Sequence, residues 1–415
     1  MARKNIRIGL DLGSSKVAVA AGVLGAENLP DIIGVGLAAH SGIRRGVVVD
    51  VEETISAVTA AVEEAEKMAG IRIDEATVSI SGNHIETLPA RGVIAVSRAD
   101  GEIVEDDVER VLEAAKALSV PANREILHVV PRSFIVDNTS DIKDPVGMTG
   151  VRLEVDANLI TAAAPQVKNL TKALLQADID IDSLVFGILA DARLLLTKRQ
   201  KELGVVLVNI GAGTASYAIY EEGALLRAGV LPVGSGHITS DLAIGLRTTV
   251  EVAEEIKIRF GKAVAKLASD REMIDMSKID PAETQVANEK YVCQIIEARL
   301  TEIFSLVREE LAALGKDTLL PAGAVLTGGG SKMTGIVELA KECLSLPVQI
   351  GVPSQGSTGV VDHYEDPAFS TALGLMLWEA EFAPKASTIS FVKGGFKTWL
   401  DATGKVKEFF KQFMP

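Results

Sequence analysis

A short polar turn near the start of the chain carries side chains that could bind a phosphate and a divalent cation. Asp11 ends an apolar run, and Gly13, Ser14, Ser15 and Lys16 follow before a second apolar run begins. Backbone N–H groups of a glycine turn can converge on phosphate oxygens, while Lys16 can meet a phosphate and Asp11 can hold Mg²⁺ through water. Because the turn opens a strand instead of a helix, it is not a Walker A loop, and an ordinary tight turn is the alternative.

Two further glycine sites strengthen the nucleotide interpretation. One is a similar turn about 200 residues later, and the other is a triple glycine between an apolar strand and a helical pattern. The second turn contains Asn209, Gly211, Gly213 and Thr214, and the triple glycine is Gly328, Gly329 and Gly330. Two similar hairpins and a glycine-rich helix start predict two domains that face each other across a nucleotide. The hairpins would lie on its phosphates and the triple glycine near its base.

The hydrophobic pattern predicts the elements that position these turns. Helical spacing covers residues 52–69, 106–119, 165–177, 250–259, 290–314 and 332–346, and Ser331 is placed to cap the last of these helices. Strands alternate with the helices, so we expect an α/β fold with a mixed or parallel sheet in each of two duplicated domains. The segment between residues 82 and 164 reads as a small inserted α+β module.

Composition excludes several classes of protein. The 415 residues include 42 Lys and Arg against 56 Asp and Glu, a formal net charge of −14, which argues against nucleic acid as the main ligand. Two cysteines cannot form a disulfide framework, and none of the Cys and His residues shows zinc-ligand spacing, so a reducing cytoplasm fits. The sequence contains no run of 18 apolar residues, so we expect no transmembrane span.

The last residues of the sequence have a different character. Residues 384–395 accumulate Pro, Ser, Thr, Lys and Gly, as a tether does, and residues 396–415 are rich in aromatic and basic side chains. Their apolar positions, at or near helical spacing, are Trp399, Leu400, Val406, Phe409, Phe410 and Phe413. Lysines occupy the other face or the flanks, so the pattern predicts an amphipathic helix that lies in a membrane surface. A terminal helix docked on its own domain is the alternative.

With these motifs, the sequence resembles the superfamily of actin, Hsp70 and sugar kinases, and within it the FtsA family of cell-division proteins. Residues 8–16 are similar to the first phosphate loop of that family, residues 209–214 to the second, and residues 326–331 to its adenosine motif. The pair Glu254 and Lys257 matches a Glu-x-x-Lys motif near ribose and adenine. The inserted module lies where FtsA carries its own domain (1C, or SHS2), and a tethered C-terminal amphipathic helix is likewise an FtsA feature.

The resemblance implies an actin-like two-domain ATPase fold divided into subdomains. Subdomain 1A would comprise residues 1–82, 165–203 and 360–383, and the inserted SHS2/1C subdomain residues 83–164. Subdomain 2A would comprise residues 204–235 and 318–359, and subdomain 2B residues 236–317. The linker 384–395 and the membrane-targeting helix 396–415 complete the division.

Arg299 has two interpretations. It falls inside the apolar stripe of the predicted helix 290–314, where an arginine most often extends its head group from the edge of a core. In FtsA the matching arginine belongs to subdomain 2B, which takes up the acidic and apolar C-terminal tail of the tubulin-like FtsZ. The resemblance therefore makes Arg299 a candidate partner-binding residue.

The function that the resemblance implies is that of an ATP-binding, actin-like adaptor. It would polymerise on the cytoplasmic side of the bacterial membrane as a peripheral protein at the division site, anchor FtsZ filaments there and recruit later divisome proteins. ATP and Mg²⁺ would be its cofactors. Asn209 stands where the family usually has Asp, and a neutral amide holds Mg²⁺ less well, so we expect at most weak hydrolysis. An amide that hydrogen-bonds the same water is the alternative there.

Two other functions remain open from the sequence. A small-molecule kinase of the same fold would share Asp11, Lys16 and the glycine loops, although it would have no use for an amphipathic terminal helix. A pilus-assembly adaptor that resembles FtsA is the second. The context of Arg299 and the terminal helix favour cell division.

Overall fold

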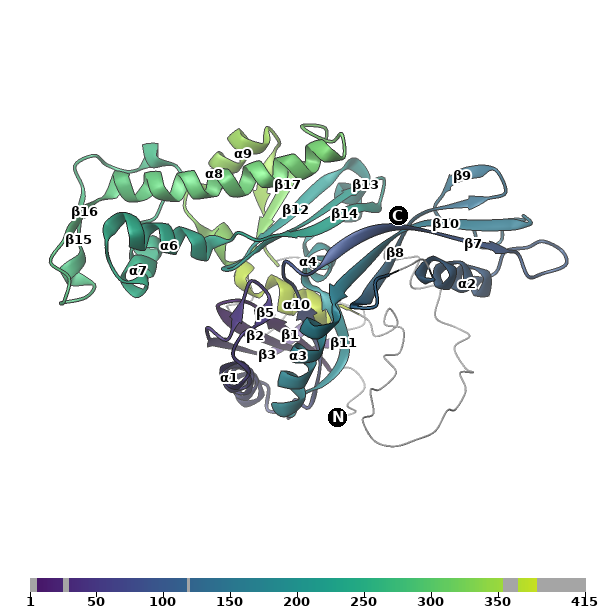
Figure 1. The fold of residues 1–415 in the computed structure, drawn as a ribbon, viewed down its shortest axis with the longest axis horizontal. Helices are drawn as coiled ribbons and strands as arrows, with labels where there is room; N and C mark the ends of the chain where they lie inside the picture. The colour runs from purple at the N-terminus through teal and green to yellow at the C-terminus, as the bar shows by residue number, and fades with distance from the viewer. Residues whose placement is uncertain (1–5, 25–29, 118–119, 354–364, 379–415) are drawn as a thin grey trace.

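Two five-stranded sheets form the centre of the computed structural model, which describes residues 6–24, 30–117, 120–353 and 365–378 (Figure 1). The first sheet has the order β3 (Pro30–Ala39), β2 (Lys16–Leu24), β1 (Ile6–Leu12), β6 (Glu75–Ile80) and β11 (Asp180–Phe186). The second has the order β14 (Ala224–Leu231), β13 (Ala215–Glu221), β12 (Val205–Ile210), β17 (Ala324–Thr327) and β18 (Val348–Ile350).

Both sheets follow the same plan. The first three strands of each order are antiparallel neighbours, and the remaining two run parallel to the central strand. The first glycine turn joins β1 to β2, and the second joins β12 to β13, which are the equivalent strands. The structure thus confirms the internal repeat, and each turn lies at the end of the central strand of its sheet.

Helices cover both sheets. In the first half these are α1 (Val51–Ala69), α3 (Ala164–Gln176), α4 (Gly187–Leu195) and α10 (Ser370–Met376), while the short α5 (Lys198–Leu203) packs on β13 of the second sheet. In the second half they are α6 (Ser235–Leu246), α7 (Val250–Phe260), α8 (Glu289–Ala313) and α9 (Ile336–Leu344). Helix α1 packs on β2 and β3, and α8 packs on α6 and α9. The apolar stripe of α8 is buried from Val292 to Leu311, as its spacing predicts.

Two short strand pairs lie outside the two large sheets and the inserted module. One pair is β4 (Ile43–Arg44) with β5 (Val47–Val48), which leads into α1, and the other is β15 (Met273–Asp275) with β16 (Val286–Asn288), which precedes α8.

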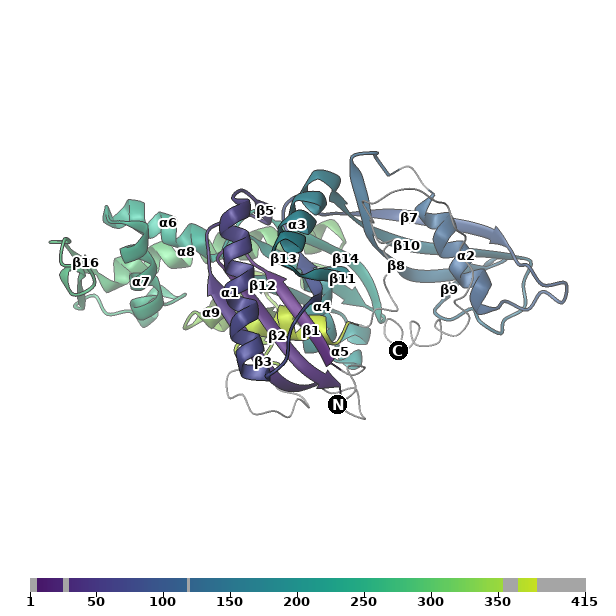
Figure 2. The ribbon, with the colours of Figure 1, turned by 90° about the horizontal axis from the view of Figure 1, so that it is seen from below.

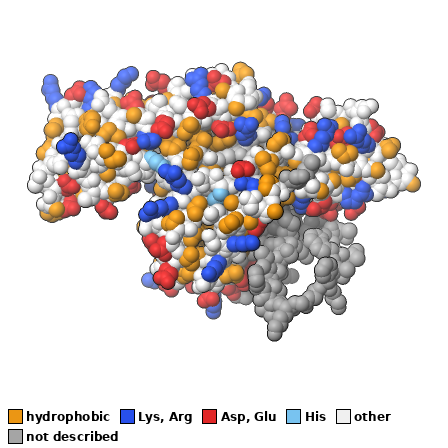
Figure 3. All heavy atoms as spheres, viewed as in Figure 1, with side chains coloured by type: hydrophobic (Ala, Val, Ile, Leu, Met, Phe, Trp, Pro, Cys, Tyr) orange, Lys and Arg blue, Asp and Glu red, His pale blue; other side chains and the backbone are white. Residues whose placement is uncertain are grey.

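No helix of the described ranges is long and apolar enough to cross a membrane. Acidic and basic side chains are interspersed over the face in Figure 3.

The inserted module forms its own sheet with one helix on it. Its elements are β7 (Glu86–Ala95), α2 (Glu105–Lys116), β8 (Arg124–Val136), β9 (Thr139–Ile142) and β10 (Arg152–Ala163), and the strand order is β7-β10-β8-β9. Figures 1 and 2 show the module at one end of the molecule and α6, α7, β15 and β16 at the other. The module also contacts the second half, because Thr87 Oγ1 donates to the Ala228 carbonyl at 2.6 Å and Asn158 Nδ2 to that of Leu225 at 2.7 Å.

One predicted helix start is wrong. The triple glycine does not open a helix capped by Ser331. Gly329–Lys332 forms a 3-10 turn, and α9 begins only at Ile336. The Ser331 hydroxyl donates back to the Gly328 carbonyl at 2.8 Å, and Gly335 takes a left-handed conformation with φ 81° immediately before the helix. That conformation interrupts a helix running from residue 332.

Candidate functional site

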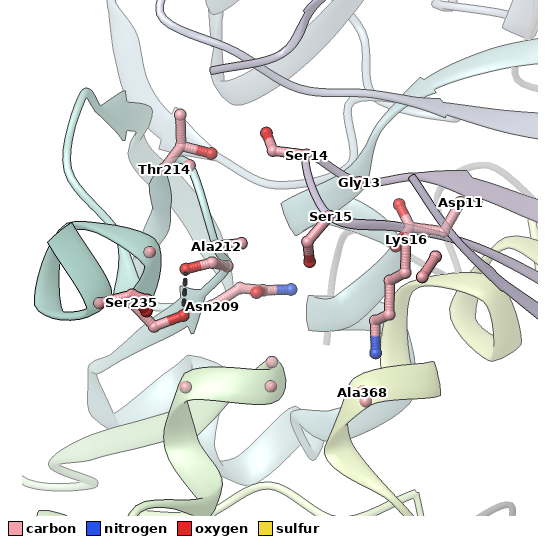
Figure 4. Close-up of a pocket in the computed structure, with 18 of the residues that line it drawn as sticks. Asp11, Gly13, Ser14, Ser15, Lys16, Asn209, Ala212, Thr214, Ser235 and Ala368 are labelled. Atoms are coloured by element: carbon pink, nitrogen blue, oxygen red, sulfur yellow. Dashed lines mark hydrogen bonds between the residues drawn. The ribbon is translucent and has the colours of Figure 1, made fainter. Parts of the chain in front are cut away.

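A cavity of about 1390 Å³ lies between the two halves, where the two glycine turns meet. Every residue that the sequence predicts to bind a nucleotide lines it. From the first turn these are Asp11, Gly13, Ser14, Ser15 and Lys16, and from the second Asn209, Gly211, Gly213 and Thr214. Glu254 and Lys257 of α7 and Gly328, Gly329 and Gly330 complete the set. Figure 4 shows the two turns on opposite sides of the cavity.

The two turns have the same internal hydrogen bond. Gly13 N donates to the Lys16 carbonyl at 3.0 Å, and Gly211 N donates to the Thr214 carbonyl at 2.9 Å. The turns also approach each other closely, because a Cβ atom at Gly213 would lie 2.6 Å from Ser14 Oγ. A side chain at position 213 would therefore push the halves apart. Glycine is needed here for close approach, not for an unusual backbone angle.

Asp11 lies at the end of β1 and is held by a serine of the neighbouring strand. Ser79 Oγ of β6 donates to Asp11 Oδ1 at 2.6 Å, and Ser79 Oγ itself accepts from Leu12 N at 2.9 Å. Burial raises the pKa of Asp11, although the Ser79 hydrogen bond and the Lys16 charge act in the opposite direction. The carboxylate is thus fixed in place at the cavity wall, with one oxygen bound by protein.

Lys16 brings a positive charge into the same part of the cavity. Burial lowers its pKa, while the nearby carboxylates of Asp11 and Asp366 raise it. Its ammonium group lies 5.8 Å from the centre of the Phe369 ring, which is a favourable cation–π distance. Asp366 in turn pairs with Lys332 of the second half at 2.6 Å, so charged side chains join the halves at this edge.

Asn209 is engaged in a way that the sequence did not reveal. Its Nδ2 donates to Asp191 Oδ2 of α4 at 2.6 Å and lies 3.3 Å from Thr371 Oγ1, while the Thr371 hydroxyl donates to Asp191 Oδ1 at 3.0 Å. Asp191 has no exposed surface. Burial raises the pKa of Asp191 to about 7, against the lowering effect of the Asn209 hydrogen bond. The available signal was an acid among the apolar residues at the start of α4 (Gly187–Leu195).

Glu254 and Lys257 form a network on the cavity-facing side of α7. Lys257 Nζ donates to Glu254 Oε2 at 2.6 Å and to Thr239 Oγ1 at 2.9 Å, and the Thr239 hydroxyl donates to the same Glu254 oxygen. Lys257 is only 8% exposed. Just beyond α7, Lys262 forms a β-bridge with Thr334, so the end of α7 adjoins the triple-glycine site. The predicted ribose and adenine motifs therefore share one end of the cavity.

Arg299 lies away from the cavity, on the side of α8 that meets α6. Its guanidinium binds Asp241 of α6 through two hydrogen bonds, from Nε at 2.6 Å and from Nη2 at 2.9 Å, and it also pairs with Glu302. The Arg299 side chain is 25% exposed. Ile244, one helical turn from Asp241 on α6, is 77% exposed. A half-buried ion pair thus adjoins an exposed apolar side chain.

The predicted membrane helix lies outside the described residues. This covers the linker 384–395 and the six apolar positions of the pattern, which are Trp399, Leu400, Val406, Phe409, Phe410 and Phe413. For them the sequence pattern is the only observation.

Known proteins share both the sequence and the fold. The family model for cell division protein FtsA matches residues 206–374, and that for the SHS2 domain inserted in FtsA matches residues 82–161. FtsA of Pseudomonas aeruginosa is 40% identical over 371 residues, 89% of this chain and 88% of that protein. FtsA of Bacillus subtilis is 38% identical over 397 residues, 96% of this chain and 88% of that protein.

Solved structures with low sequence identity have the same architecture. The PilM–PilN type IV pilus biogenesis complex contains a chain with a TM-score of 0.66 at 18% identity, covering 89% of this chain and 97% of that one. MreB5 of Spiroplasma citri bound to ADP has a TM-score of 0.51 at 14% identity, covering 90% and 95%.

The duplicated sheets and the cavity between them define the class as an actin-like ATPase fold, here with an SHS2 domain inserted. One protein of this fold, MreB5 of Spiroplasma citri, is bound to ADP in its solved structure. Within it, this chain belongs to the family of cell division protein FtsA.

Proposed function

We propose that the cavity binds ATP together with Mg²⁺. The observation that carries this proposal is that every residue predicted to bind the phosphates, ribose or adenine lines one cavity between two equivalent hairpins. The backbone N–H groups of the turns and the Lys16 ammonium suit the phosphates. At the other end of the cavity, the hydrogen-bond network of α7 adjoins the triple glycine, and the ribose and base would lie there.

The donors of the site fit Mg²⁺ bound mainly by water and phosphate. In the described ranges, no three His, Cys, Asp or Glu side chains come together as a metal cage. Mg²⁺ usually keeps several waters and binds through one or two carboxylates plus substrate phosphates, so Asp11 alone is a suitable protein group. Its fixed carboxylate would orient a metal-bound water. When bound, the ion would neutralise phosphate charge.

Turnover would be slow, because the second turn lacks a carboxylate of its own. Asn209 is neutral, and its NH₂ group is already directed at Asp191. We expect ATP binding by calorimetry, and phosphate release well below the roughly 1 s⁻¹ at the slow end of ordinary enzymes. Release at or above that rate would contradict a mainly structural role.

The wider role that we propose is that of a division adaptor at the membrane. The protein would polymerise on the cytoplasmic face of the cell membrane, attach through residues 396–415, bind the C-terminal tail of FtsZ and recruit later divisome proteins. Membership of the FtsA family and the amphipathic pattern of the terminal residues support this role. A pull-down with an FtsZ tail peptide tests the partner directly, since a small-molecule kinase would not retain it.

Arg299 and its surroundings support a peptide site on the second half. An acidic and apolar tail could exchange its carboxylates for Asp241 at the guanidinium and cover Ile244. A pilus-assembly adaptor of the same fold is the second candidate. The likeness to the PilM–PilN complex is one of fold at 18% identity, against 40% identity to a division protein, and this difference favours cell division.

A further inference from the structure

A buried acid stands directly behind the second phosphate turn. Asn209 and Thr371 line the cavity, and Asp191 lies behind both of them with no exposed surface. Each carboxylate oxygen of Asp191 accepts one hydrogen bond, from Asn209 Nδ2 at 2.6 Å and from Thr371 Oγ1 at 3.0 Å. Three elements, α4, the end of β12 and α10, therefore meet at this carboxylate.

The Asp191 carboxylate fixes which way the Asn209 amide points. In its ionised form the Asp191 carboxylate only accepts hydrogen bonds, and each of its oxygens faces a donor, so the amide directs its NH₂ group toward Asp191. Asn209 Nδ2 also lies 3.3 Å from Thr371 Oγ1, and this second contact favours the same orientation. The amide oxygen is then left on the cavity side, next to Gly328, where a Cβ atom would lie only 2.2 Å from it.

We propose that Asp191 is a positioning residue that makes Asn209 present an oxygen to the cavity, so that an amide takes the place of the usual carboxylate toward a hydrated divalent cation. This inference rests on the proposed binding of ATP with Mg²⁺. Water bound to a cation donates hydrogen bonds, so an oxygen can accept from it, whereas a reversed amide would direct its own hydrogens at that water. The carboxylate thus belongs to Asp191, behind Asn209, and not to the phosphate turn itself.

The arrangement changes what a single substitution would do. Asn209→Asp alone would set two carboxylates about as close as the present 2.6 Å contact, in a buried place where both cannot ionise. The exchange variant, Asn209→Asp with Asp191→Asn, keeps one acid and one amide in contact. It differs from wild type only in carrying the charge on the turn instead of behind it.

The test uses the full chain and two measurements on four proteins. These are wild type, Asp191→Asn, Asn209→Asp and the exchange variant. The first measurement is the melting temperature without nucleotide, and the second is the gain in ATP affinity when Mg²⁺ replaces EDTA. We expect Asp191→Asn, which replaces the charged acceptor by a neutral amide, to lose about tenfold of the Mg²⁺-dependent gain, because hydrogen bonds to charged groups are the stronger ones. Its affinity in EDTA should change little.

The exchange variant should regain both the melting temperature and the Mg²⁺-dependent gain that Asn209→Asp loses. Ser370→Ala is the matched control, because it removes the nearby buried hydrogen bond from Thr327, 2.8 Å long, without touching Asn209. It should lower the melting temperature and leave the gain intact.

Two results would overturn the proposal: a full Mg²⁺-dependent gain in Asp191→Asn, or an exchange variant that melts no higher than Asn209→Asp. Wild-type protein that binds no ATP in either buffer would instead overturn the proposed function. The melting temperatures would still show whether Asp191 and Asn209 act as a pair.

Discussion

At Arg299, a guanidinium that the family resemblance assigns to a partner peptide is already paired within the chain. Its two hydrogen bonds to Asp241 give it the core-edge position that the helical spacing predicts. The two interpretations are compatible, because the pair is partly exposed and a peptide carboxylate can compete for it. Any test of binding must therefore separate the loss of a peptide contact from the loss of an internal ion pair.

We predict that Arg299→Glu abolishes binding of the FtsZ tail and also lowers the melting temperature. The new carboxylate would face Asp241 and Glu302, as well as the acidic peptide, at a cost of several kcal/mol to binding. Arg308→Glu is the matched control, since Arg308 lies on the same helix and binds Asp317 at 3.0 Å. Fluorescence anisotropy should show normal binding for this control. Equal loss in both variants would return Arg299 to a purely structural role.

His128 makes stability depend on pH. Burial lowers the pKa of His128 to about 4, and its Nε2 accepts a hydrogen bond from Phe186 N at 3.0 Å. The unfolded chain takes up a proton near pH 6.5 and the folded chain only near pH 4. The folded state therefore loses up to about 3 kcal/mol as the pH falls between these values.

Denaturant titrations between pH 7 and 4 test this prediction by comparing wild type with His128→Gln, which keeps an acceptor for Phe186. The variant should lose less stability over the range. Asp191 acts in the opposite direction in both proteins, because its raised pKa favours proton uptake by the folded state. Parallel curves would show that His128 does not titrate as described.

Sequence patterns locate residues in motifs and miss those that act through space. Asp11, Lys16 and Asn209 sit in turns with a recognisable layout, and all of them line the cavity. Asp191 and Ser79 come from a helix and a strand with no motif of their own. Only the folded arrangement shows that they hold Asn209 and Asp11.

At the scale of elements, apolar periodicity predicted the long helices to within a few residues. The predicted helix 290–314 is α8 (Glu289–Ala313), and the predicted helix 52–69 is α1 (Val51–Ala69). The start of α9 could not be predicted in this way, because Lys332 and the residues after it continue a helical spacing while the backbone turns at Gly335. Periodicity reports which side is buried, not where the backbone leaves the helix.

The start of α1 is anchored to a loop that borders the cavity. The Asp50 side chain accepts from Glu53 N at 3.0 Å as an N-cap, and the Glu53 carboxylate accepts from Ser41 N at 2.7 Å. We predict that Asp50→Ala costs about 1 kcal/mol of stability, the usual value of a lost N-cap. Glu52→Ala, at an exposed neighbour in the same turn, is the control for chemical denaturation. A loss as large in the control would argue against capping as the cause.

At the scale of the whole molecule, self-assembly and membrane attachment should be coupled. If residues 396–415 form the proposed membrane helix, each aromatic side chain that enters the bilayer surface would add roughly 1.5 to 3 kcal/mol, and each lysine near an anionic surface about 1 kcal/mol. Ordering a short helix opposes this gain, so a single tail should bind weakly. Polymerisation would bring many tails to one surface and convert weak contacts into avidity.

We predict that deleting residues 396–415, or making Phe409→Glu with Phe410→Glu, leaves a folded protein that no longer floats with anionic liposomes. Gly404→Glu with Gln412→Glu is the matched control, because it adds the same charge on the polar side of the pattern. The control should keep most of the binding. Flotation of the truncated protein at the level of the full chain would show that the anchor lies elsewhere.

The chain enters and leaves the inserted module at one place, and Arg124 ties the two ends together. Arg124 Nη2 donates to the His84 carbonyl at 2.8 Å, where the chain enters, and to the Thr161 carbonyl at 3.1 Å, where it leaves. The two ends of the module therefore lie close together, as the ends of an insertable domain must. A foreign domain with the same spacing of ends could replace it if it restored the two backbone contacts on β14 and covered the apolar surface that Val130, Ile160 and Ala162 bury against the body. Lineages could thereby acquire new binding surfaces without altering the chemistry of the cavity.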